Sequence, residues 1–153
     1  MQAAAKIHGP ANEVDKVREM RLGANWFYWV AIAAVLNSSI VYFLSVPNQF
    51  FGLGMSRYID NHFTFDALGN RYLTGLAANI GIALVLAGFG FLARRGGDVA
   101  FIVGMFLYVF DAIVTLSYGD VFGIFGLGFH LLAFFFMFKG LLASRRRYDP
   151  SVE

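Results

Sequence analysis

Cysteine is absent from this chain of 153 residues, and proline and charged residues are scarce. Without cysteine there is no disulfide exchange, no thiolate metal site and no covalent haem attachment, although the redox compartment stays open. Charged residues make up 14% of the chain against 58% hydrophobic residues, a balance that does not fit a soluble globular domain. The net charge of +2 rests on dispersed basic residues, which excludes a nucleic-acid-binding groove as a partner site.

The chain is instead dominated by four long apolar segments and contains 18 phenylalanines. A helix needs about 20 apolar residues to cross the hydrocarbon core of a bilayer. The sequence therefore predicts an all-α membrane protein, with four transmembrane helices in an antiparallel bundle and an outer amphipathic connector helix. The predicted spans cover residues 26–44, 72–93, 99–118 and 121–143. Together they form one transmembrane domain over residues 24–143.

The polar segments between and around the spans have their own patterns. Residues 1–23 are read either as a helix on the membrane surface or as a solvated, partly frayed leader. Pro47 ends the first span, Asp98 is expected to cap the third, and residues 144–153 form a basic tail. The connector is predicted as an interfacial helix over residues 48–62, either an ordered lid or a plain surface connection. Its apolar face would hold Phe51, Met55, Tyr58, Ile59 and His62, and its polar face Ser56, Arg57, Asp60 and Asn61.

The basic residues predict the orientation of the chain in the membrane. The leader, the Arg94-Arg95 turn and the Arg145–Arg147 tail all fall on one side of a four-span topology. By the positive-inside rule this side is the cytoplasm, so both termini are expected there. No cleavable signal peptide is expected, because 23 residues, which include two glutamates and an aspartate, precede the first apolar run.

Each predicted span carries one strongly polar residue at a similar depth. At about 1.5 Å per residue, these residues lie roughly 10–13 Å inside the outer boundary of the spans. An ionisable group at such a depth is costly unless it faces protein or water. The four residues of this predicted polar layer are Asn37, Asn79, Asp111 and His130.

The neighbours of Asp111 and His130 indicate that both face the inside of the bundle. On the fourth span, small residues recur with His130 at spacings of three and four, which is typical of closely packed helices. On the third span, Tyr108 and Thr115 share the face of Asp111. Since only residues 119–120 separate the two spans, the sequence predicts that Asp111 and His130 touch, directly or through one water.

Two functions are compatible with this layer. In the first, Asn37, Asn79, Asp111 and His130 hydrogen-bond to one another and fix the helix register of a non-enzymatic structural or accessory protein, such as a subunit of a larger assembly. In the second, Asp111 and His130 form a site open to the outer face, which serves a small transporter or binding protein for protons, a cation or a polar head group. The expected partners are the lipid bilayer and either another membrane protein or a second copy.

Other chemistry receives little support, and we expect no enzyme activity, cofactor or metal. A bis-histidine haem needs two intramembrane imidazoles, but His8 and His62 lie outside the predicted spans. One carboxylate, one imidazole and amide oxygens make a thin ligand set for a divalent metal. A serine hydrolase would need a serine such as Ser38 beside His130, and no nucleophile-elbow or glycine-rich phosphate motif accompanies it.

The C-terminal apolar region contains the segments AFIVGMFLYVFDAI, GD and FHLLAFFFMFKG, all between residues 100 and 140. In these segments the chain resembles small four-span bacterial membrane proteins that have no assigned activity. The resemblance implies the four-span topology and a bacterial cytoplasmic membrane. It implies no functional residue.

Overall fold

The computed structural model describes residues 10–45, 53–64, 73–119 and 121–148, with only the backbone at residues 10–12, 121–123 and 147–148. The predictions for residues 1–9, Pro47 and residues 149–153 lie outside these ranges. The same holds for residues 48–52 of the predicted connector helix.

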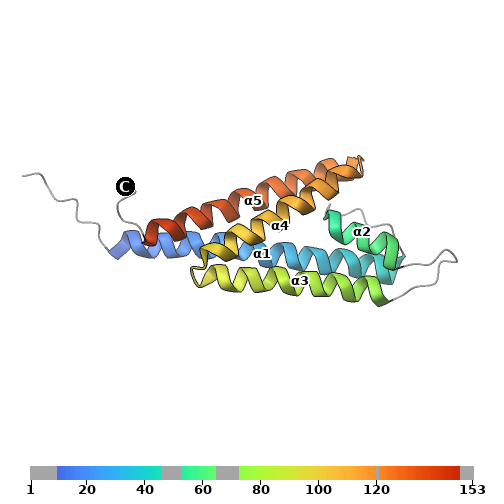
Figure 1. Cartoon of the computed structure of the whole chain (residues 1–153), viewed down its shortest axis with the longest axis horizontal. Helices are drawn as coiled ribbons and strands as arrows, with labels where there is room; N and C mark the ends of the chain where they lie inside the picture. The colour runs from blue at the N-terminus through green and yellow to red at the C-terminus, as the bar shows by residue number, and fades with distance from the viewer. Residues whose placement is uncertain (1–9, 46–52, 65–72, 120, 149–153) are drawn as a thin grey trace, which may run out of the picture.

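Four long helices run back and forth along the molecule (Figure 1). They are α1 (Pro10–Leu44), α3 (Leu73–Arg94), α4 (Asp98–Ser117) and α5 (Val121–Tyr148), with the short helix α2 (Gly54–Phe63) between α1 and α3 in sequence. All four long helices have the length and apolar composition needed to cross a membrane. The predicted fold class, an antiparallel four-helix membrane bundle with a connector helix, is confirmed. We call the end at which α4 turns into α5 the outer end.

The first helix is longer than the predicted first span. Pro10 occupies its first helical position, where the missing N–H is tolerated. From there α1 continues without a break to Leu44, so residues 10–23 are neither a separate surface helix nor a frayed leader. At the opposite end of the molecule from the α4–α5 turn, the Lys16 ammonium donates to the carbonyl oxygen of Arg146 at 3.5 Å. This contact joins the polar extension of α1 to the last turns of α5.

The tight turns follow the sequence prediction. Gly96, between α3 and α4, has φ of 88°, and Gly119, after α4, has φ of 63°. Glycine adopts such positive φ values without the steric penalty that a Cβ brings. Gly96 lies in the short connection expected between the second and third spans, and Gly119 lies where the third span was expected to end.

The predicted capping role of Asp98 is wrong. Gly97 occupies the N-cap position of α4, and no side-chain cap is formed there. The Asp98 carboxylate instead accepts a hydrogen bond of 2.6 Å from the Ser144 hydroxyl and lies 3.9 Å from the Arg145 guanidinium. Asp98 therefore fixes the start of α4 against α5.

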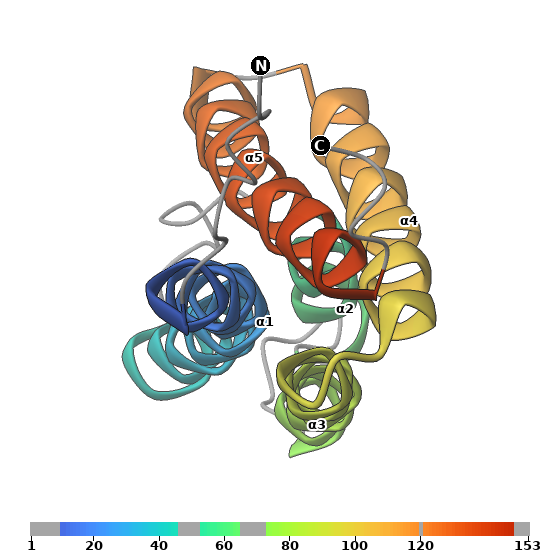
Figure 2. The same cartoon turned by 90° about the vertical axis from the view of Figure 1, so that its left-hand side faces the viewer.

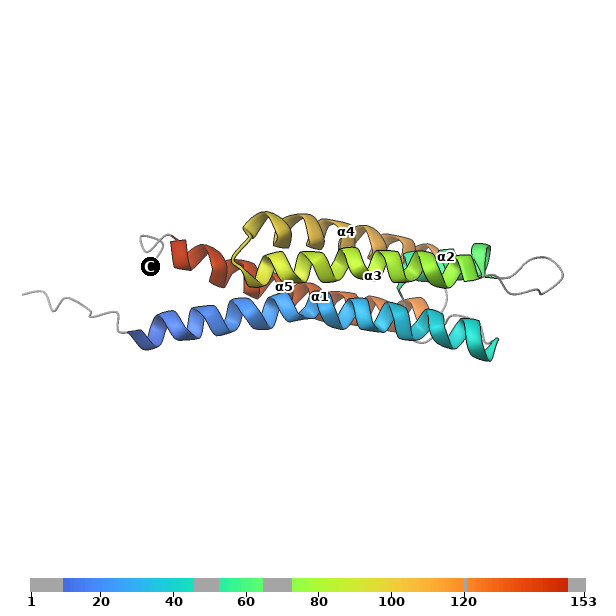
Figure 3. The ribbon, with the colours of Figure 1, turned by 90° about the horizontal axis from the view of Figure 1, so that it is seen from below.

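The core lies along the predicted inner faces of the helices. α1 and α3 run side by side (Figure 3), and α5 packs on both α1 and α4. Gly23 and Gly140 meet where α1 and α5 cross, since an added Cβ at Gly23 would lie 2.5 Å from Cα of Gly140. Phe27 is fully buried at the centre of the core, although the sequence pattern did not single it out. Tyr108 and Thr115 on α4 and His130 on α5 are buried, as predicted, and the buried residues along the same faces include Gly104, Gly126, Ala133 and Met137.

α2 is present as predicted, but its predicted orientation is wrong. Ser56 and Asp60 are only 4% and 1% exposed, whereas Tyr58 is 45% exposed. The helix contacts α1, α3 and α4, and the view along the bundle places it among the long helices (Figure 2). In a membrane protein a polar face must be satisfied by protein, while an apolar face can meet lipid. The side of α2 that faces inward therefore carries Ser56 and Asp60 together with Ile59, whereas Tyr58 and Phe63 lie on the exposed side.

α2 begins inside the bundle and runs toward the outer end. Its first residue, Gly54, packs on the backbone of Asp111 and on the side chain of Thr115. At its other end Thr64 packs against Gly75, the third residue of α3. Asp111 lies six residues before the end of α4, which corresponds to about 9 Å of helix. We therefore describe α2 as a re-entrant helix, a geometry that membranes tolerate where protein surrounds it.

Candidate functional site

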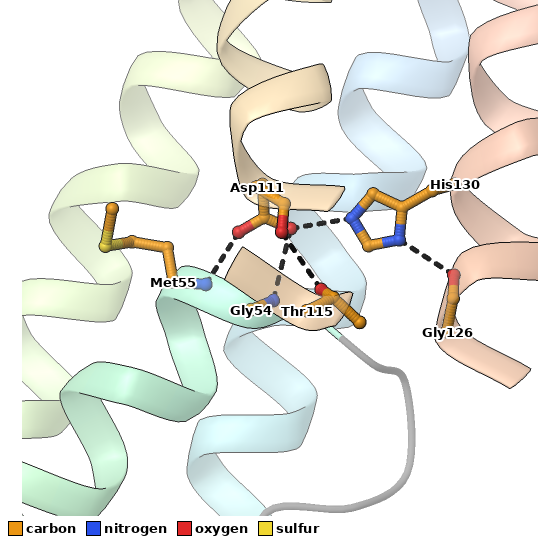
Figure 4. A network of polar contacts seen from close by, with 6 residues as sticks. All are labelled: Gly54, Met55, Asp111, Thr115, Gly126 and His130. Carbon is orange, nitrogen blue, oxygen red and sulfur yellow. Dashed lines mark hydrogen bonds and ion pairs between the residues drawn. The ribbon is translucent and has the colours of Figure 1, made fainter. Parts of the chain in front are cut away.

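Asp111 and His130 lie in direct contact at the inner end of the re-entrant helix. Nε2 of His130 is 2.7 Å from Oδ2 of Asp111, with the two side chains 2% and 15% exposed (Figure 4). The predicted contact between these residues is confirmed. It joins α4 to α5 below their connection, since Asp111 lies about one and a half turns before the end of α4 and His130 about two and a half turns after the start of α5.

The Asp111 carboxylate also holds the N-terminus of α2. Oδ1 accepts a hydrogen bond of 2.7 Å from the Met55 N–H, and Oδ2 accepts one of 3.2 Å from the Gly54 N–H. The N-cap residue of α2 is Leu53, which has no side chain able to cap these groups. A carboxylate from another helix thus takes the role of a cap, placed where the helix dipole favours negative charge.

Gly54 is needed for this contact because α2 and α4 approach each other closely. A Cβ built at Gly54 would lie 2.6 Å from the Asp111 carbonyl oxygen and 2.8 Å from Oγ1 of Thr115. Real Cβ atoms do not come so close to other heavy atoms. The Thr115 hydroxyl donates to the same Asp111 carbonyl at 3.0 Å. This bond within α4 fixes the position of the two residues on which Gly54 packs.

The contacts of the two ring nitrogens of His130 show where the hydrogens of the Asp111–His130 pair lie. Its Nδ1 is 2.7 Å from the carbonyl oxygen of Gly126, which can only accept, so Nδ1 carries a hydrogen. A second hydrogen must lie between Nε2 and the Asp111 carboxyl, on one or the other, to make that contact a hydrogen bond. Either placement gives a pair with no net charge, which suits a buried position.

Tyr108 completes this first cluster from the side of α4. Its ring stacks on the His130 imidazole with centroids 4.5 Å apart and an interplanar angle of 18°. The hydroxyl of Tyr108 is buried and has no hydrogen-bond partner among the described residues. A buried phenol normally finds such a partner. Tyr108 therefore fixes the imidazole plane while keeping a hydrogen-bonding group unused.

A second polar cluster surrounds Asp60 on α2. Oδ1 of Asp60 accepts hydrogen bonds from the Ser38 hydroxyl at 2.7 Å and from the Asn79 amide at 2.8 Å. The Asn79 amide also lies 3.0 Å from the Ser38 hydroxyl and 3.4 Å from the Ser56 carbonyl oxygen. The Thr64 hydroxyl is 3.4 Å from the same carboxylate oxygen. This cluster ties the second half of α2 to α1 and α3.

The predicted polar layer is therefore divided between two clusters. Asp111 and His130 are brought together with Tyr108 and Thr115, as expected from the shared helix faces. Asn79 bonds instead to residues around Asp60 on α2. Asn37 is fully buried on α1, next in sequence to Ser38. The hypothesis of one hydrogen-bonded layer made by the four span residues alone is wrong, because α2 lies between its members.

The sequence prediction missed Asp60, Ser38 and the backbone of α2. The sequence pattern places Asp60 on the polar face of an interfacial helix, although Ser56, Asp60 and Thr64 recur every four residues and form a polar stripe of their own. Beside a membrane bundle with buried asparagines, such a stripe can pair inward. The sequence offers Ser38 as a nucleophile, whereas in the structure its hydroxyl donates to Asp60 in the cluster just described.

An apolar cavity of about 420 Å³ borders the first cluster. Its walls come from all of the first four helices, and among the described residues that line it only Ser56, Tyr108 and Asp111 carry polar side chains. Val85 on α3 and Leu107 and Phe110 on α4 line the cavity and are 42–55% exposed on the surface expected to face lipid. The cavity therefore opens sideways between α3 and α4. The outer side of Asp111, where the sequence predicted an opening, is occupied by the first turn of α2.

No family model, no curated protein and no solved structure matches the chain. The resemblance suggested by residues 100–140 is thus not supported by these comparisons. Within the described ranges, no three His, Cys, Asp or Glu side chains are grouped so that they could hold a metal ion. The fold and the four candidate spans define the class: a small, multi-pass helical membrane protein.

Proposed function

We propose that this is a non-enzymatic structural or accessory protein of the membrane, whose buried polar groups hold the re-entrant helix in the bundle. The observation that carries this proposal is the placement of one carboxylate, Asp111, between the N-terminus of α2 and the imidazole of His130. Both ring nitrogens of His130 are also occupied by bonds within the chain. Because Asp111 and His130 already form these bonds, they hold the helices together and have little capacity left to transfer protons.

Ion transport provides the test of this proposal. The purified protein, reconstituted in liposomes with a trapped pH-sensitive dye, should give no proton flux above that of protein-free liposomes under an imposed pH gradient. The same should hold for potassium, measured with a potassium-sensitive dye. A flux that depends on protein amount and is abolished by Asp111→Asn would contradict the proposal and favour transport.

We also propose that both termini face the cytoplasm and that the membrane is a bacterial inner membrane. The positive charges at Arg94, Arg95 and Arg145 support this orientation. Because the chain has no cysteine, a single cysteine introduced by substitution is the only thiol in the protein that a maleimide can label. In intact cells a membrane-impermeant maleimide should label Ser117→Cys and spare Arg146→Cys until the cells are opened. The reverse pattern would contradict the orientation, and equal labelling of both would contradict the four-span topology.

A second candidate function is favoured by the cavity. A volume of about 420 Å³ falls in the range typical of small-molecule sites, and the cavity reaches the carboxylate of Asp111. We propose as the alternative a membrane binding protein that takes its ligand from the bilayer. The partners we propose in either case are the bilayer itself and another membrane protein or a second copy.

A further inference from the structure

We propose that the cavity between α3 and α4 binds an uncharged, single-chain lipid alcohol, with its hydroxyl at Asp111 and Tyr108 and its chain toward the bilayer. This inference rests on the second candidate function, in which the protein binds a ligand taken from the bilayer, and it names the chemical class of that ligand. It uses three observations: the sideways opening, the neutrality of the polar pair and the unused hydrogen-bonding capacity at the cavity wall.

The opening selects a ligand that arrives through the bilayer. Val85, Leu107 and Phe110 line the cavity and are exposed on the surface expected to face lipid. Gly81 also lines the cavity, and apart from its own helix no atom lies within 4 Å of a Cβ built there. An apolar chain can therefore lie along α3 at Gly81 and remain in contact with hydrocarbon at the cavity mouth.

The charge of the site selects an uncharged head group. Asp111 and His130 with their shared hydrogen form a pair without net charge, as derived above from the Gly126 and Asp111 contacts. Among the described residues that line the cavity, none is basic. A phosphate or carboxylate would therefore lose its hydration without gaining a counter-ion, and a cation would meet an already neutralised acid.

The unused hydrogen-bonding capacity selects a hydroxyl. A carboxylate offers about four acceptor positions. At Asp111 three of them receive the Gly54 N–H, the Met55 N–H and the His130 contact, which leaves one on Oδ1. The Tyr108 hydroxyl, on the same cavity wall, has no partner among the described residues. A ligand hydroxyl can donate to Asp111 and accept from Tyr108, whereas an ether or ester oxygen can only accept.

Photolabelling in nanodiscs of phosphatidylcholine tests the inference. The probe is hexadecanol with a diazirine on its chain, compared with the methyl ether and the carboxylic acid of the same chain. Labelled peptides are mapped by mass spectrometry. The alcohol should label residues around Ile82, Val85 and Leu107, in preference to other lipid-facing positions. It should exceed the ether and the acid there by about three- to tenfold, as expected for one or two hydrogen bonds.

Two glycine variants on the same helix provide a matched comparison. Gly81→Leu places a side chain in the cavity and should reduce labelling of its walls by about tenfold or more. Gly88 is also on α3, has open space at its Cβ and does not line the cavity, so Gly88→Leu should leave the labelling unchanged. Tyr108→Phe, which removes only the unpartnered hydroxyl, should reduce the preference for alcohol over ether by about two- to tenfold.

The possible outcomes separate the ligand class from the binding function. Cavity labelling that is equal for alcohol, ether and acid, or unaffected by Tyr108→Phe, would overturn the lipid-alcohol assignment while leaving a binding function in place. Labelling by all three probes that is spread evenly over the four spans and insensitive to Gly81→Leu would overturn both. The Gly81→Leu and Tyr108→Phe variants leave the bonds of Asp111 with α2 intact, so a loss of labelling in them is not a loss of the fold.

Discussion

Replacing Gly54 with leucine should expel the re-entrant helix from the bundle. A Cβ at this position would lie 2.6 Å from the Asp111 carbonyl oxygen, and the rest of the leucine side chain has no space on the backbone of α4. Overpacking of this kind costs about 1–3 kcal/mol, and the two N–H bonds to Asp111 add about 1 kcal/mol each when they break. We expect a loss of about 3 kcal/mol or more in the free energy of unfolding, measured by titration with SDS from mixed micelles.

The position of α2 can be followed separately from stability. Ser56 lies on the buried face of α2, and its hydroxyl has no hydrogen-bond partner among the described residues, so Ser56→Cys is a mild change. In the parent protein this cysteine should react slowly with a water-soluble maleimide. Adding Gly54→Leu should make the reaction fast, because the long helices around α2 no longer bury the cysteine.

Gly128 provides the matched control for Gly54. It is also a helical glycine, but apart from its own helix nothing lies within 4 Å of an added Cβ. Gly128→Leu should be neutral or stabilising by up to about 1 kcal/mol, because leucine is the better helix former. Equal effects of the two substitutions, with Ser56→Cys still protected, would contradict the close packing of α2 on α4.

The fold was predictable because the bilayer makes simple demands on sequence. Long apolar runs, glycine turns and the distribution of arginine are local signals, and they gave the four helices and the alternating directions. The contact between Asp111 and His130 was predictable for a related reason. Both residues flank one short turn, and their neighbours at three- and four-residue spacing are small or polar.

The role of α2 was not predictable from the same signals. An amphipathic segment of ten residues has the same pattern whether its polar face meets water or buried asparagines. The choice depends on Ser38 and Asn79, which come from distant parts of the chain and meet Asp60 only in the folded bundle. Likewise, no sequence pattern marks a carboxylate that caps a different helix, as Asp111 does for α2.

Replacing Asp111 should be the most damaging change of a polar side chain in the first cluster. Asp111→Leu leaves the Gly54 and Met55 N–H groups without their acceptor and Nε2 of His130 without its hydrogen-bond partner. Removing one partner from a buried pair costs about 3–5 kcal/mol. Asp111→Asn should cost less, since its amide oxygen can still accept from Met55 and its amide nitrogen can donate to Nε2 of His130. We expect the order of unfolding free energies to be parent, then Asp111→Asn, then Asp111→Leu.

The double variant decides whether the pair acts as one unit. If Asp111 and His130 depend on each other, the double replacement Asp111→Leu with His130→Leu should cost much less than the sum of the two single changes, with a coupling of about 1–3 kcal/mol. It should not return to the parent stability, because the Gly54 and Met55 N–H groups still lack the acceptor that Asp111 supplies. Ser117 serves as the control, since its exposed hydroxyl donates to the nearby Val114 carbonyl within the same helix. Ser117→Ala should change stability by less than about 0.5 kcal/mol. Strict additivity of the two single changes would mean that the 2.7 Å contact does not stabilise the bundle, and the role proposed for Asp111 would then reduce to capping α2.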